Sequence, residues 1–296
     1  MKEISIIFPA ARQSQVIHPF WAEEAKAAED AGFSVNTVTD PNDAGALRIN
    51  GSGGESSIYR GWMVKPQYYK EMSSLRPLLN DYDNLMWSYE FPKWYDVLKD
   101  ETPHSLIIPG TEISDIGLQK IVEIVIEKCG TKSLILKDYL KSRKHEWFDA
   151  CFIKDASDFE EVARIASNFF YLQGKDFYGG LVFRDFIPLK KLGFHPTTKM
   201  PIPIEFRTFF FNQKPFITSL YWNNDLEYPK DIEYPPQSWI ESIGKKLTGS
   251  SFVALDIAQA EDDQWYVIEV NDGGMSGFPK SLGAEEFYRL LKEAIA

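Results

Sequence analysis

Residues 251–277 read SFVALDIAQAEDDQWYVIEVNDGGMSG and contain two apolar runs joined by an acidic turn. The runs are Phe252–Ala258 and Trp265–Val270, and the turn is Glu261–Gln264. Apolar runs of this length on either side of a short polar turn predict an antiparallel β-hairpin. A glycine-rich segment, 272–277, follows the second run. The C-terminal part of the chain is therefore expected to be built around two adjacent strands.

Three oxygen-bearing side chains lie on this hairpin. Asp256 sits among apolar residues on the first run, and Glu269 and Asn271 lie two apart at the end of the second. Residues two apart share one face of a strand, so the three side chains can converge. Mg²⁺ takes oxygen ligands in proteins, usually one or two carboxylates with phosphates completing the shell. Each residue alone is explained by an exposed strand position or a turn, but the combined set favours a metal site.

The pattern D-x-A on one strand and E-x-N on its partner resembles the C-terminal core of the ATP-grasp superfamily. Members of that superfamily bind Mg²⁺-ATP through an Asp on one strand and a Glu-x-Asn on the next. The resemblance implies an α/β (α+β) chain in which two subdomains grip ATP, preceded by a small α/β domain. It also implies that Asp256, Glu269 and Asn271 are the residues that bind Mg²⁺.

The composition is ordinary for a soluble globular enzyme that is large enough for more than one domain. The 296 residues are 44% hydrophobic and 25% charged, with a formal net charge of −11. This acidic balance argues weakly against nucleic-acid or membrane partners. Two cysteines, Cys129 and Cys151, form no ligand pattern and suggest a reducing compartment. Since neither a signal peptide nor a bilayer-spanning run is visible, a cytoplasmic location is expected.

Residues 1–104 predict a separate N-terminal α/β domain. A strand over Glu3–Phe8, a helix over Pro19–Ala31 and a strand over Phe33–Val38 indicate a parallel β-α-β unit. Because no G-x-G-x-x-G joins the first strand to the helix, a Rossmann dinucleotide site is not expected. The polar, glycine-rich residues 40–56 predict a loop.

Arg60 lies among apolar residues in the predicted strand Ser57–Val64. Two explanations stay open for it: a structural pair with a carboxylate, or contact with an anionic substrate. Further along, a short strand is predicted at Asn84–Ser88, and a helix with proline at its start at Phe91–Leu98. These segments complete the predicted N-terminal domain.

The ATP-grasp domain is predicted over 105–296, and its first subdomain over 105–182. Its first helix is predicted at Ser114–Cys129, with Ser114 as the N-cap and Gly130 beyond its end. These signals place a helix between two strands of the subdomain.

A strand ending at Lys137 is followed by a polar loop that contains Lys141. A lysine at a strand end and a basic loop suit polyphosphate binding, although a solvated basic turn has the same composition. The resemblance implies that Lys137 and Lys141 contact ATP. The family often has Lys-Pro and a glycine-rich loop here, whereas this chain has Lys137-Asp138 and no glycine. Basic side chains are therefore expected to carry more of the phosphate contact than backbone amides.

The second subdomain is predicted over 183–296 and begins at GLVFRDFIPL, residues 180–189. This run resembles the hinge strand of the family, whose backbone binds adenine, and implies that Asp185, Phe186 and Ile187 contact the nucleotide. Arg184 replaces the acid that the family usually has at this place. Contact with a phosphate or a substrate carboxylate is expected for it, and a salt bridge to a nearby Asp is the alternative.

The strand predicted at Ile204–Phe211 carries Glu205 and Arg207 two apart, which resembles the E-x-R of the family. The resemblance implies that Arg207 reaches the γ-phosphate and stabilises charge during phosphoryl transfer. The loop after the hairpin could approach an acylphosphate closely, because glycine has no side chain, and an ordinary flexible turn is the alternative. The loop residues expected to bind substrate are Gly273, Gly274 and Ser276.

One lysine, Lys137, and two arginines, Arg184 and Arg207, arrive in the order that resembles the clade named for two arginines and a lysine. The resemblance implies an ATP-dependent carboxylate–amine ligase with Mg²⁺ and ATP as cofactors. Its partners would be a carboxylate and an amine, as small molecules or peptides, and ATP-grasp proteins are frequently homodimers. An ATP-grasp phosphotransferase and a non-catalytic ATP-binding module are the alternatives. Lys137, Arg184 and Arg207 are the expected catalytic residues, with Arg60 and Arg184 as candidates for the acceptor carboxylate.

Overall fold

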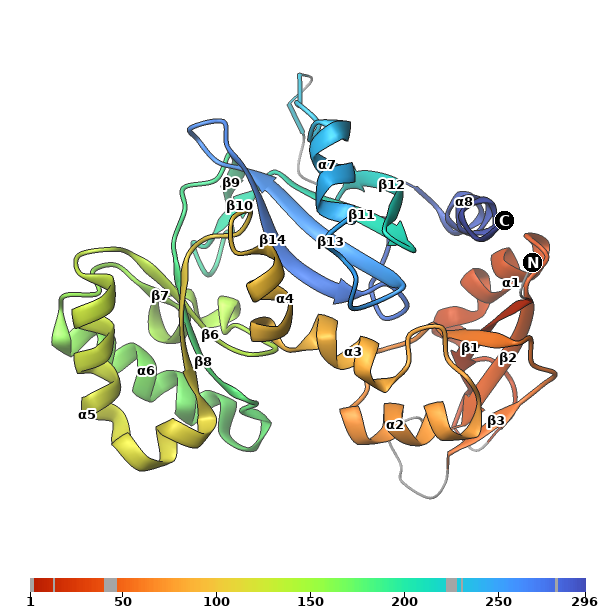
Figure 1. Cartoon of the computed structure of the whole chain (residues 1–296), viewed down its shortest axis with the longest axis horizontal. Helices are drawn as coiled ribbons and strands as arrows, with labels where there is room; N and C mark the ends of the chain where they lie inside the picture. Colours follow the sequence, from red (N-terminus) through yellow and green to blue (C-terminus); the bar gives the residue numbers. More distant parts are fainter. Residues whose placement is uncertain (1–2, 13, 40–46, 222–227, 230, 280–281) are drawn as a thin grey trace.

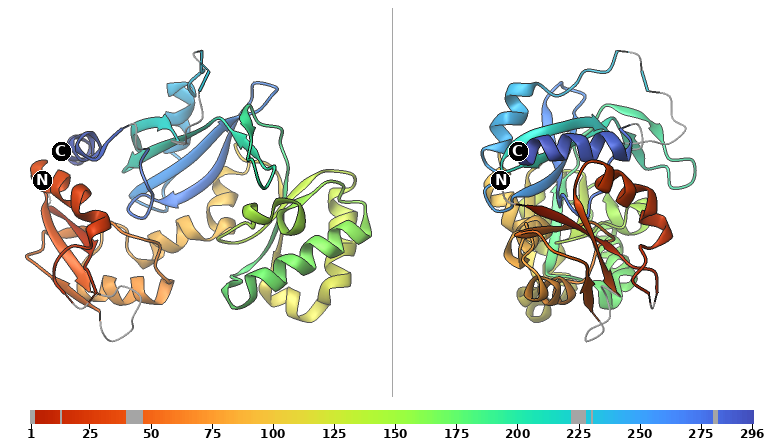
Figure 2. Two further views of the ribbon diagram at one scale, coloured as in Figure 1. Left: turned by 180° about the vertical axis from the view of Figure 1, so that it is seen from behind. Right: turned by 90° about the vertical axis from the view of Figure 1, so that its right-hand side faces the viewer.

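The computed structural model describes the chain except residues 1–2, 13, 40–46, 222–227, 230 and 280–281. Three four-stranded β-sheets form three neighbouring bodies, shown in Figure 1 with helices on their outer faces. The two ends of the chain lie side by side (Figures 1 and 2), because the first helix, α1 (Ala22–Asp30), packs against the last, α8 (Ala284–Ile295). No helix among the described residues is long and apolar enough to cross a membrane.

The N-terminal sheet has the strand order β3-β2-β1-β4. Its strands are β1 (Ile4–Pro9), β2 (Ser34–Thr39), β3 (Arg48–Asn50) and β4 (Ser56–Tyr59). Strand β1 pairs in parallel with both β2 and β4, which confirms the predicted β-α-β unit. The loop prediction for 40–56 is wrong at β3, which pairs with β2, and its part at 40–46 lies outside the described residues.

Three helices connect the N-terminal sheet to the rest of the chain. They are α2 (Pro66–Leu75), α3 (Tyr82–Tyr89) and α4 (Phe91–Leu98). The predicted strand at Asn84–Ser88 is wrong, because these residues lie in α3. Asp81 caps that helix by accepting a hydrogen bond from the backbone of Asn84, whose side chain accepts one in return from the backbone of Asp81. The predicted helix at Phe91–Leu98 is confirmed.

The second sheet has the order β5-β8-β6-β7. It consists of β5 (Ser105–Pro109), β6 (Leu134–Asp138), β7 (Phe152–Ile153) and β8 (Gly180–Asp185), with helices α5 (Gly110–Cys129) and α6 (Phe159–Gln173) and the short helical turns η2 (Lys144–Glu146), η3 (Trp147–Cys151) and η4 (Gly174–Asp176). The predicted N-cap at Ser114 is wrong, because α5 begins at Gly110. The Oγ atom of Ser114 donates instead to the carbonyl of Thr111. A non-helical residue, Gly117 at φ 72°, divides α5.

The third sheet has the order β12-β11-β13-β14 and contains the predicted hairpin. Its strands are β11 (Glu205–Phe211), β12 (Lys214–Leu220), β13 (Phe252–Gln259) and β14 (Trp265–Asp272), and helix α7 (Gln237–Gly244) covers one face. The small β9 (Lys191–Phe194) and β10 (Pro201–Pro203) pair separately, and η1 (Pro19–Trp21) precedes α1. All pairings in the third sheet are antiparallel.

Several apolar cores hold the three sheets in place. Apolar residues of the N-terminal sheet, of α8 and of one face of the third sheet share one core, in which Phe209 contacts both Phe252 and Phe287. The second sheet instead has its own core with α5 and α6, which contains Leu134, Leu136 and Phe183. The N-terminal and third sheets thus share a core. The second sheet has its own core toward α5 and α6, and on its other face Val182 packs in one apolar cluster with Leu255 and Val270 of the third sheet.

Candidate active site

One face of the third sheet changes from apolar to charged along its length. On β11, alternate residues Arg207, Phe209 and Phe211 point to the same side, since successive side chains of a strand alternate between faces. Phe209 and Phe211 enter the shared core, whereas Arg207 lies in register with Asp256 on β13, which in turn lies opposite Glu269 on β14. The charged end of the face therefore holds residues from three adjacent strands.

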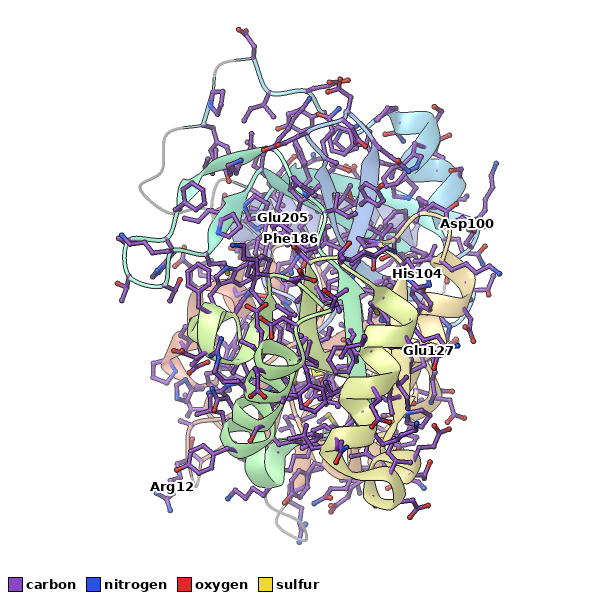
Figure 3. All side chains as sticks on the ribbon, turned by 90° about the vertical axis from the view of Figure 1, so that its left-hand side faces the viewer. Arg12, Asp100, His104, Glu127, Phe186 and Glu205 are labelled. Carbon is purple, nitrogen blue, oxygen red and sulfur yellow. The ribbon has the colours of Figure 1, made fainter. Side chains whose placement is uncertain are left out.

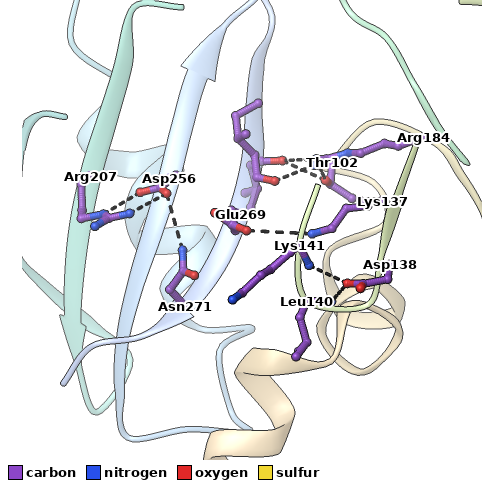
Figure 4. A network of polar contacts seen from close by, with 12 residues as sticks. Thr102, Lys137, Asp138, Leu140, Lys141, Arg184, Arg207, Asp256, Glu269 and Asn271 are labelled. Atoms are coloured by element: carbon purple, nitrogen blue, oxygen red, sulfur yellow. Dashed lines mark hydrogen bonds and ion pairs between the residues drawn. The ribbon is translucent and has the colours of Figure 1, made fainter. Parts of the chain in front are cut away.

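The predicted metal-binding residues lie together on this face (Figure 4). Asp256 is buried, Glu269 is directly opposite it on β14, and Asn271 follows two residues later. The Nδ2 atom of Asn271 lies 3.5 Å from Oδ2 of Asp256. Among the described residues, no three His, Cys, Asp or Glu side chains form a group that could hold a metal. A cation here would therefore depend on two carboxylates, the Asn271 amide oxygen and ligands from outside the protein.

Arg207 forms a bidentate pair with Asp256. Its Nε and Nη2 atoms donate to the two carboxylate oxygens at 2.7 Å each, and both side chains are buried. Nη1 donates to the carbonyl of Gly277 at 2.9 Å, and the guanidinium lies 4.2 Å from the ring centre of Tyr221. This fork fixes the carboxylate in one plane on the sheet, as planar guanidinium–carboxylate pairs do.

Acidic groups crowd this face. Burial, followed by the charge of Asp256, raises the pKa of Glu205 to about 8. Figure 3 labels Glu205 at the start of β11 and Phe186 just beyond β8. Carboxylates that raise one another's pKa are stabilised by a nearby cation. The face is therefore electrostatically suited to a positively charged ligand.

Lys137 reaches this face from the second sheet. It lies at the end of β6, on the side of the sheet away from α5 and α6, and Figure 4 shows it pointing toward Glu269. Its Nζ is 3.9 Å from Oε1 of Glu269 and 5.4 Å from the ring centre of Phe91. Burial lowers the pKa of the Lys137 ammonium, and Glu269 opposes that shift. The structure thus brings together an ammonium from one sheet and the carboxylates of another.

Asp138 holds the basic loop that follows Lys137. One carboxylate oxygen accepts hydrogen bonds from the backbone amides of Leu140 and Lys141, at 2.8 and 2.6 Å. The other accepts from Nε2 of Gln173 at 2.6 Å and from the amide of Tyr178 at 3.3 Å. Asp138, which stands where the family often has proline, thus anchors the turn after β6 through its side chain, as aspartates commonly do in turns. Figure 4 shows the Lys141 side chain extended toward β14.

The family comparison agrees with this arrangement of two sheets. A family model described as "ATP-grasp domain, R2K clade family 3" matches residues 128–291. The chain belongs to this ATP-grasp family. No curated protein matches the chain.

Solved structures share the fold of this ATP-grasp chain at low sequence identity. A RimK domain ATP-grasp protein from Sphaerobacter thermophilus has a TM-score of 0.64 and 12% identity, with 98% of each chain covered. D-cycloserine synthetase DcsG has a TM-score of 0.60 and 10% identity, covering 99% of this chain and 100% of its own. D-alanyl-alanine synthetase A from Vibrio cholerae has a TM-score of 0.56 and 15% identity, covering 100% and 98%. The predicted ATP-grasp fold and clade are confirmed.

Two of the residues predicted to form the adenine-binding hinge, Asp185 and Phe186, use their backbone amides within the protein. The amide of Asp185 donates to the carbonyl of His104, and that of Phe186 to the carbonyl of Ser133, both at 2.8 Å. The Asp185 carboxylate accepts from Nζ of Lys132 at 2.6 Å. Strand β8 ends at Asp185, so Phe186 and Ile187 lie just beyond it. Adenine contact at these residues stays a prediction.

Arg184 contacts main-chain carbonyls of β14 rather than a carboxylate. The register between β13 and β14 shifts after Asp256, which leaves Ile268 unpaired as a β-bulge. Arg184 Nη1 donates to the carbonyl of Ile268 at 2.5 Å, and Nη2 to that of Val267 at 2.8 Å. Burial lowers the pKa of Arg184 to about 10, so the group is charged at neutral pH. The salt bridge to a nearby Asp considered from the sequence is not present among the described residues, and the arginine holds the backbone just before Glu269. Contact of Arg184 with a substrate stays a prediction.

Replacing Arg184 with methionine is expected to weaken the binding of Mg²⁺-nucleotide about tenfold, as loss of a partner that orients a ligand does. Unfolding stability should fall by about 2 kcal/mol, because buried carbonyls lose their donor. Titrations of ATP with and without Mg²⁺ check this prediction. The affinity for ATP should fall in the presence of Mg²⁺ and stay the same in its absence. Arg164→Met, an exposed arginine on α6, is the matched control. If the affinity for ATP falls by the same factor with and without Mg²⁺, the bulge does not position Glu269.

Arg60 ties the N-terminal sheet to the glycine-rich loop. Its guanidinium is buried, pairs with Glu24, and donates to the carbonyls of Gly274 and Ser276. Of the two explanations left open by the sequence, the structure shows the carboxylate pair. Burial lowers the pKa of Arg60, but Glu24 and Tyr288 together more than compensate, so its pKa is raised overall. Substrate contact by Arg60 stays a prediction.

The glycines of the loop allow close packing between sheets. A Cβ on Gly274 would lie 2.3 Å from the carbonyl oxygen of Tyr59, and one on Gly273 would lie 2.7 Å from the ring of Phe252. Neither distance admits a side chain. Ser276 is buried, and its Oγ donates to the carbonyl of Asp272 at 2.7 Å. The loop is thus packed against the N-terminal sheet, and substrate contact by its residues stays a prediction.

An asparagine that the sequence analysis did not single out holds the start of β13 and the end of β14. Asn80 Oδ1 accepts from the amides of Ser251 and Phe252, and Nδ2 donates to Oδ2 of Asp272 at 2.6 Å. Burial raises the pKa of Asp272 to about 6, against the hydrogen bond from Asn80. The position next to Asn271 could have drawn attention to Asp272, but no local pattern connects it to Asn80.

Proposed function

We propose that this protein is an ATP-dependent carboxylate–amine ligase. The observation that carries the proposal is the meeting of Lys137 with Asp256, Glu269 and Asn271 between two sheets. ATP would lie between the sheets, with its phosphates toward Lys137 and Lys141. The substrates would be a carboxylate and an amine, as small molecules or peptides. An ATP-grasp ligase, PsnB, has been solved with a minimal precursor, Mg and ADP, and shares the fold.

The acidic residues suit one divalent cation that phosphates also hold. Asp256 and Glu269 supply carboxylate oxygens, and Asn271 supplies an amide oxygen, in the number that Mg²⁺ commonly takes from proteins when phosphates complete its shell. When bound, the cation would neutralise negative charge that develops on the transferred phosphoryl group. Arg207 orients the Asp256 carboxylate, and Lys137 supplies a fixed positive charge for a phosphate oxygen.

The proposed reaction has two group transfers. A substrate carboxylate oxygen attacks the γ-phosphorus of ATP, the bond to the β-phosphate oxygen breaks, and ADP leaves with an acylphosphate formed. The amine then attacks the acyl carbon, loses a proton, and phosphate leaves as the amide forms. Closure of the second sheet against the third would keep water away from the acylphosphate. The partly exposed Glu269 carboxylate and the buried Lys137 ammonium lie where the sheets meet.

The test is incubation with Mg²⁺-ATP and a panel of amino acids and dipeptides, followed by identification of the nucleotide and of any new mass. ADP together with a condensed product supports the ligase. ADP with a phosphorylated product that ignores added amines assigns a phosphotransferase. AMP overturns γ-phosphoryl transfer. Binding of Mg²⁺-ATP without turnover on any panel member would favour a non-catalytic binding module.

Removing magnesium is expected to abolish most of the stabilisation that ATP gives. A ligand that binds only the folded state raises the free energy of unfolding by about 2.7 kcal/mol at a hundred times its dissociation constant. Thermal unfolding with ATP and Mg²⁺ should therefore give a higher midpoint than unfolding with ATP and a chelator. The same midpoint in both conditions would contradict a metal site at Asp256 and Glu269.

A further inference from the structure

An exposed aromatic cluster lies beside the candidate active site on the N-terminal body. Trp62 is 42% exposed and Phe20 is 68% exposed, and their ring centres are 5.6 Å apart. The Trp62 ring also meets His18 edge-on at 4.9 Å and Trp21 at 5.4 Å. Large aromatic groups that stay together at the surface commonly mark a place where a ligand binds. The roles described so far make no use of this cluster.

The cluster is fixed relative to the glycine-rich loop. The hydroxyl of Tyr59 donates to the carbonyl of Trp62 at 3.1 Å, which holds the turn after β4. Arg60, in the same turn, is bound to the carbonyls of Gly274 and Ser276. The turn therefore keeps its position relative to Asn271, which directly precedes that loop, and a ligand on the cluster would be held at a defined place relative to Asn271.

The next residue, Met63, connects the cluster to the candidate catalytic groups. Met63 is 45% exposed and lines a cavity together with Lys137, Glu269 and Asn271. The cavity measures about 10 Å³, which is room for about one water molecule. It is too small for a nucleotide, and it lies between the candidate phosphate end of the site and the turn that carries Trp62. The turn after β4 therefore carries both an exposed ring of the cluster, Trp62, and a residue that lines this cavity, Met63.

We propose that Phe20 and Trp62 of this cluster, together with the neighbouring Met63, bind an aromatic side chain of one substrate, an amino acid or short peptide. This inference rests on the proposed ligase function and names its substrate class. An aromatic ring would lie on Trp62 and Phe20, with Met63 along its edge toward the cavity. Aromatic pairs and sulfur–aromatic contacts favour such packing over an aliphatic or polar side chain. The substrate's reacting group would then be directed to the cavity beside Lys137 and Glu269.

The test measures direct binding of the dipeptides Phe-Ala, Leu-Ala and Ser-Ala to the protein loaded with Mg²⁺-ADP, by titration calorimetry and ligand-observed NMR. We expect Phe-Ala to bind about tenfold tighter than Ser-Ala, which corresponds to one added aromatic contact. Trp62→Ala and Phe20→Ala should each abolish this preference. Phe194→Ala removes an equally exposed phenylalanine on β9 and should leave the preference unchanged.

Each other result overturns the proposal. Equal affinities for the three dipeptides, no binding of Phe-Ala, or the same loss in Phe194→Ala would each assign no substrate to the cluster. Dimerisation that Trp62→Ala removes would assign the surface to contact between copies of the chain. The Phe20 variant keeps the test decisive if Trp62→Ala unfolds, because Phe20 is largely exposed. Failure of Mg²⁺-ATP to bind in parallel titrations would contradict the ligase function. The dipeptide affinities would still show whether the cluster prefers an aromatic side chain.

Discussion

Asp256→Asn is expected to lower turnover by about two to three orders of magnitude, the effect of removing one group that stabilises transition-state charge. The buried carboxylate is the residue of the charged face that Arg207 holds in a bidentate pair. Asparagine keeps the size of the side chain and one acceptor oxygen, but it has no charge for a cation. The measurement is steady-state ADP formation with saturating ATP over a range of Mg²⁺ concentrations.

The same variant should lose stability, because Arg207 remains buried without its counter-charge. Breaking a buried pair by removing one charge costs about 3–5 kcal/mol, and the retained amide oxygen should reduce that figure. Asp262→Asn, at the exposed hairpin turn, is the matched control and should leave both turnover and stability unchanged. The double variant Asp256→Asn with Arg207→Met separates the two roles: it should regain stability without regaining turnover. Unimpaired turnover in Asp256→Asn would contradict the metal assignment.

Lys137→Met should remove phosphate binding while leaving the fold intact or more stable. Burial already lowers the pKa of this ammonium, so the native structure bears an unfavourable desolvation term that methionine lacks. Methionine retains the aliphatic stem against Phe91. A lost charge-assisted contact to a phosphate corresponds to roughly 2–3 kcal/mol, a factor of about 30 to 150 in ATP affinity.

Calorimetric titration with Mg²⁺-ATP and thermal unfolding together check this prediction. Lys154→Met, an exposed lysine after β7, serves as the control and should bind ATP as the natural chain does. Lower stability together with unchanged ATP affinity in Lys137→Met would mean that the lysine is a structural partner of Glu269 and not a phosphate ligand. Unchanged or higher stability together with lower ATP affinity supports the proposed role of Lys137 as a phosphate ligand.

The hairpin and its set of polar residues were predictable because they follow from local rules. Alternation along a strand places Glu269 and Asn271 on one face, and antiparallel pairing brings Asp256 opposite. Asp256, Glu269 and Asn271 indicated the ATP-grasp superfamily, and the order of Lys137, Arg184 and Arg207 along the chain then indicated the clade. Residue spacing in the sequence therefore predicts those parts of the site whose geometry is set within one hairpin or one strand.

The partners of the arginines were not predictable in the same way. Arg184 contacts β14 through a bulge at Ile268, and no residue type or spacing in the sequence marks that irregularity. Arg60 meets Gly274 and Ser276 across more than two hundred residues. The helix α3 was mistaken for a strand because its apolar run is short, and short apolar runs carry no clear period. Contacts between bodies distant in the chain depend on the assembled fold.

The aspartate that anchors the basic loop has a consequence for the thermodynamics of nucleotide binding. Two hydrogen bonds from the amides of Leu140 and Lys141 to Asp138 fix the backbone of residues 138–141 before any ligand arrives, and two more, from Gln173 and Tyr178, hold the carboxylate itself. Fixing the backbone of one residue costs roughly 1–2 kcal/mol in conformational entropy, and a glycine-rich loop bears that cost when its ligand binds. Here the loss of entropy takes place during folding. If ATP binds here as proposed, the chain would meet it with an ordered loop, and more of the contact energy of Lys137 and Lys141 would be available as affinity.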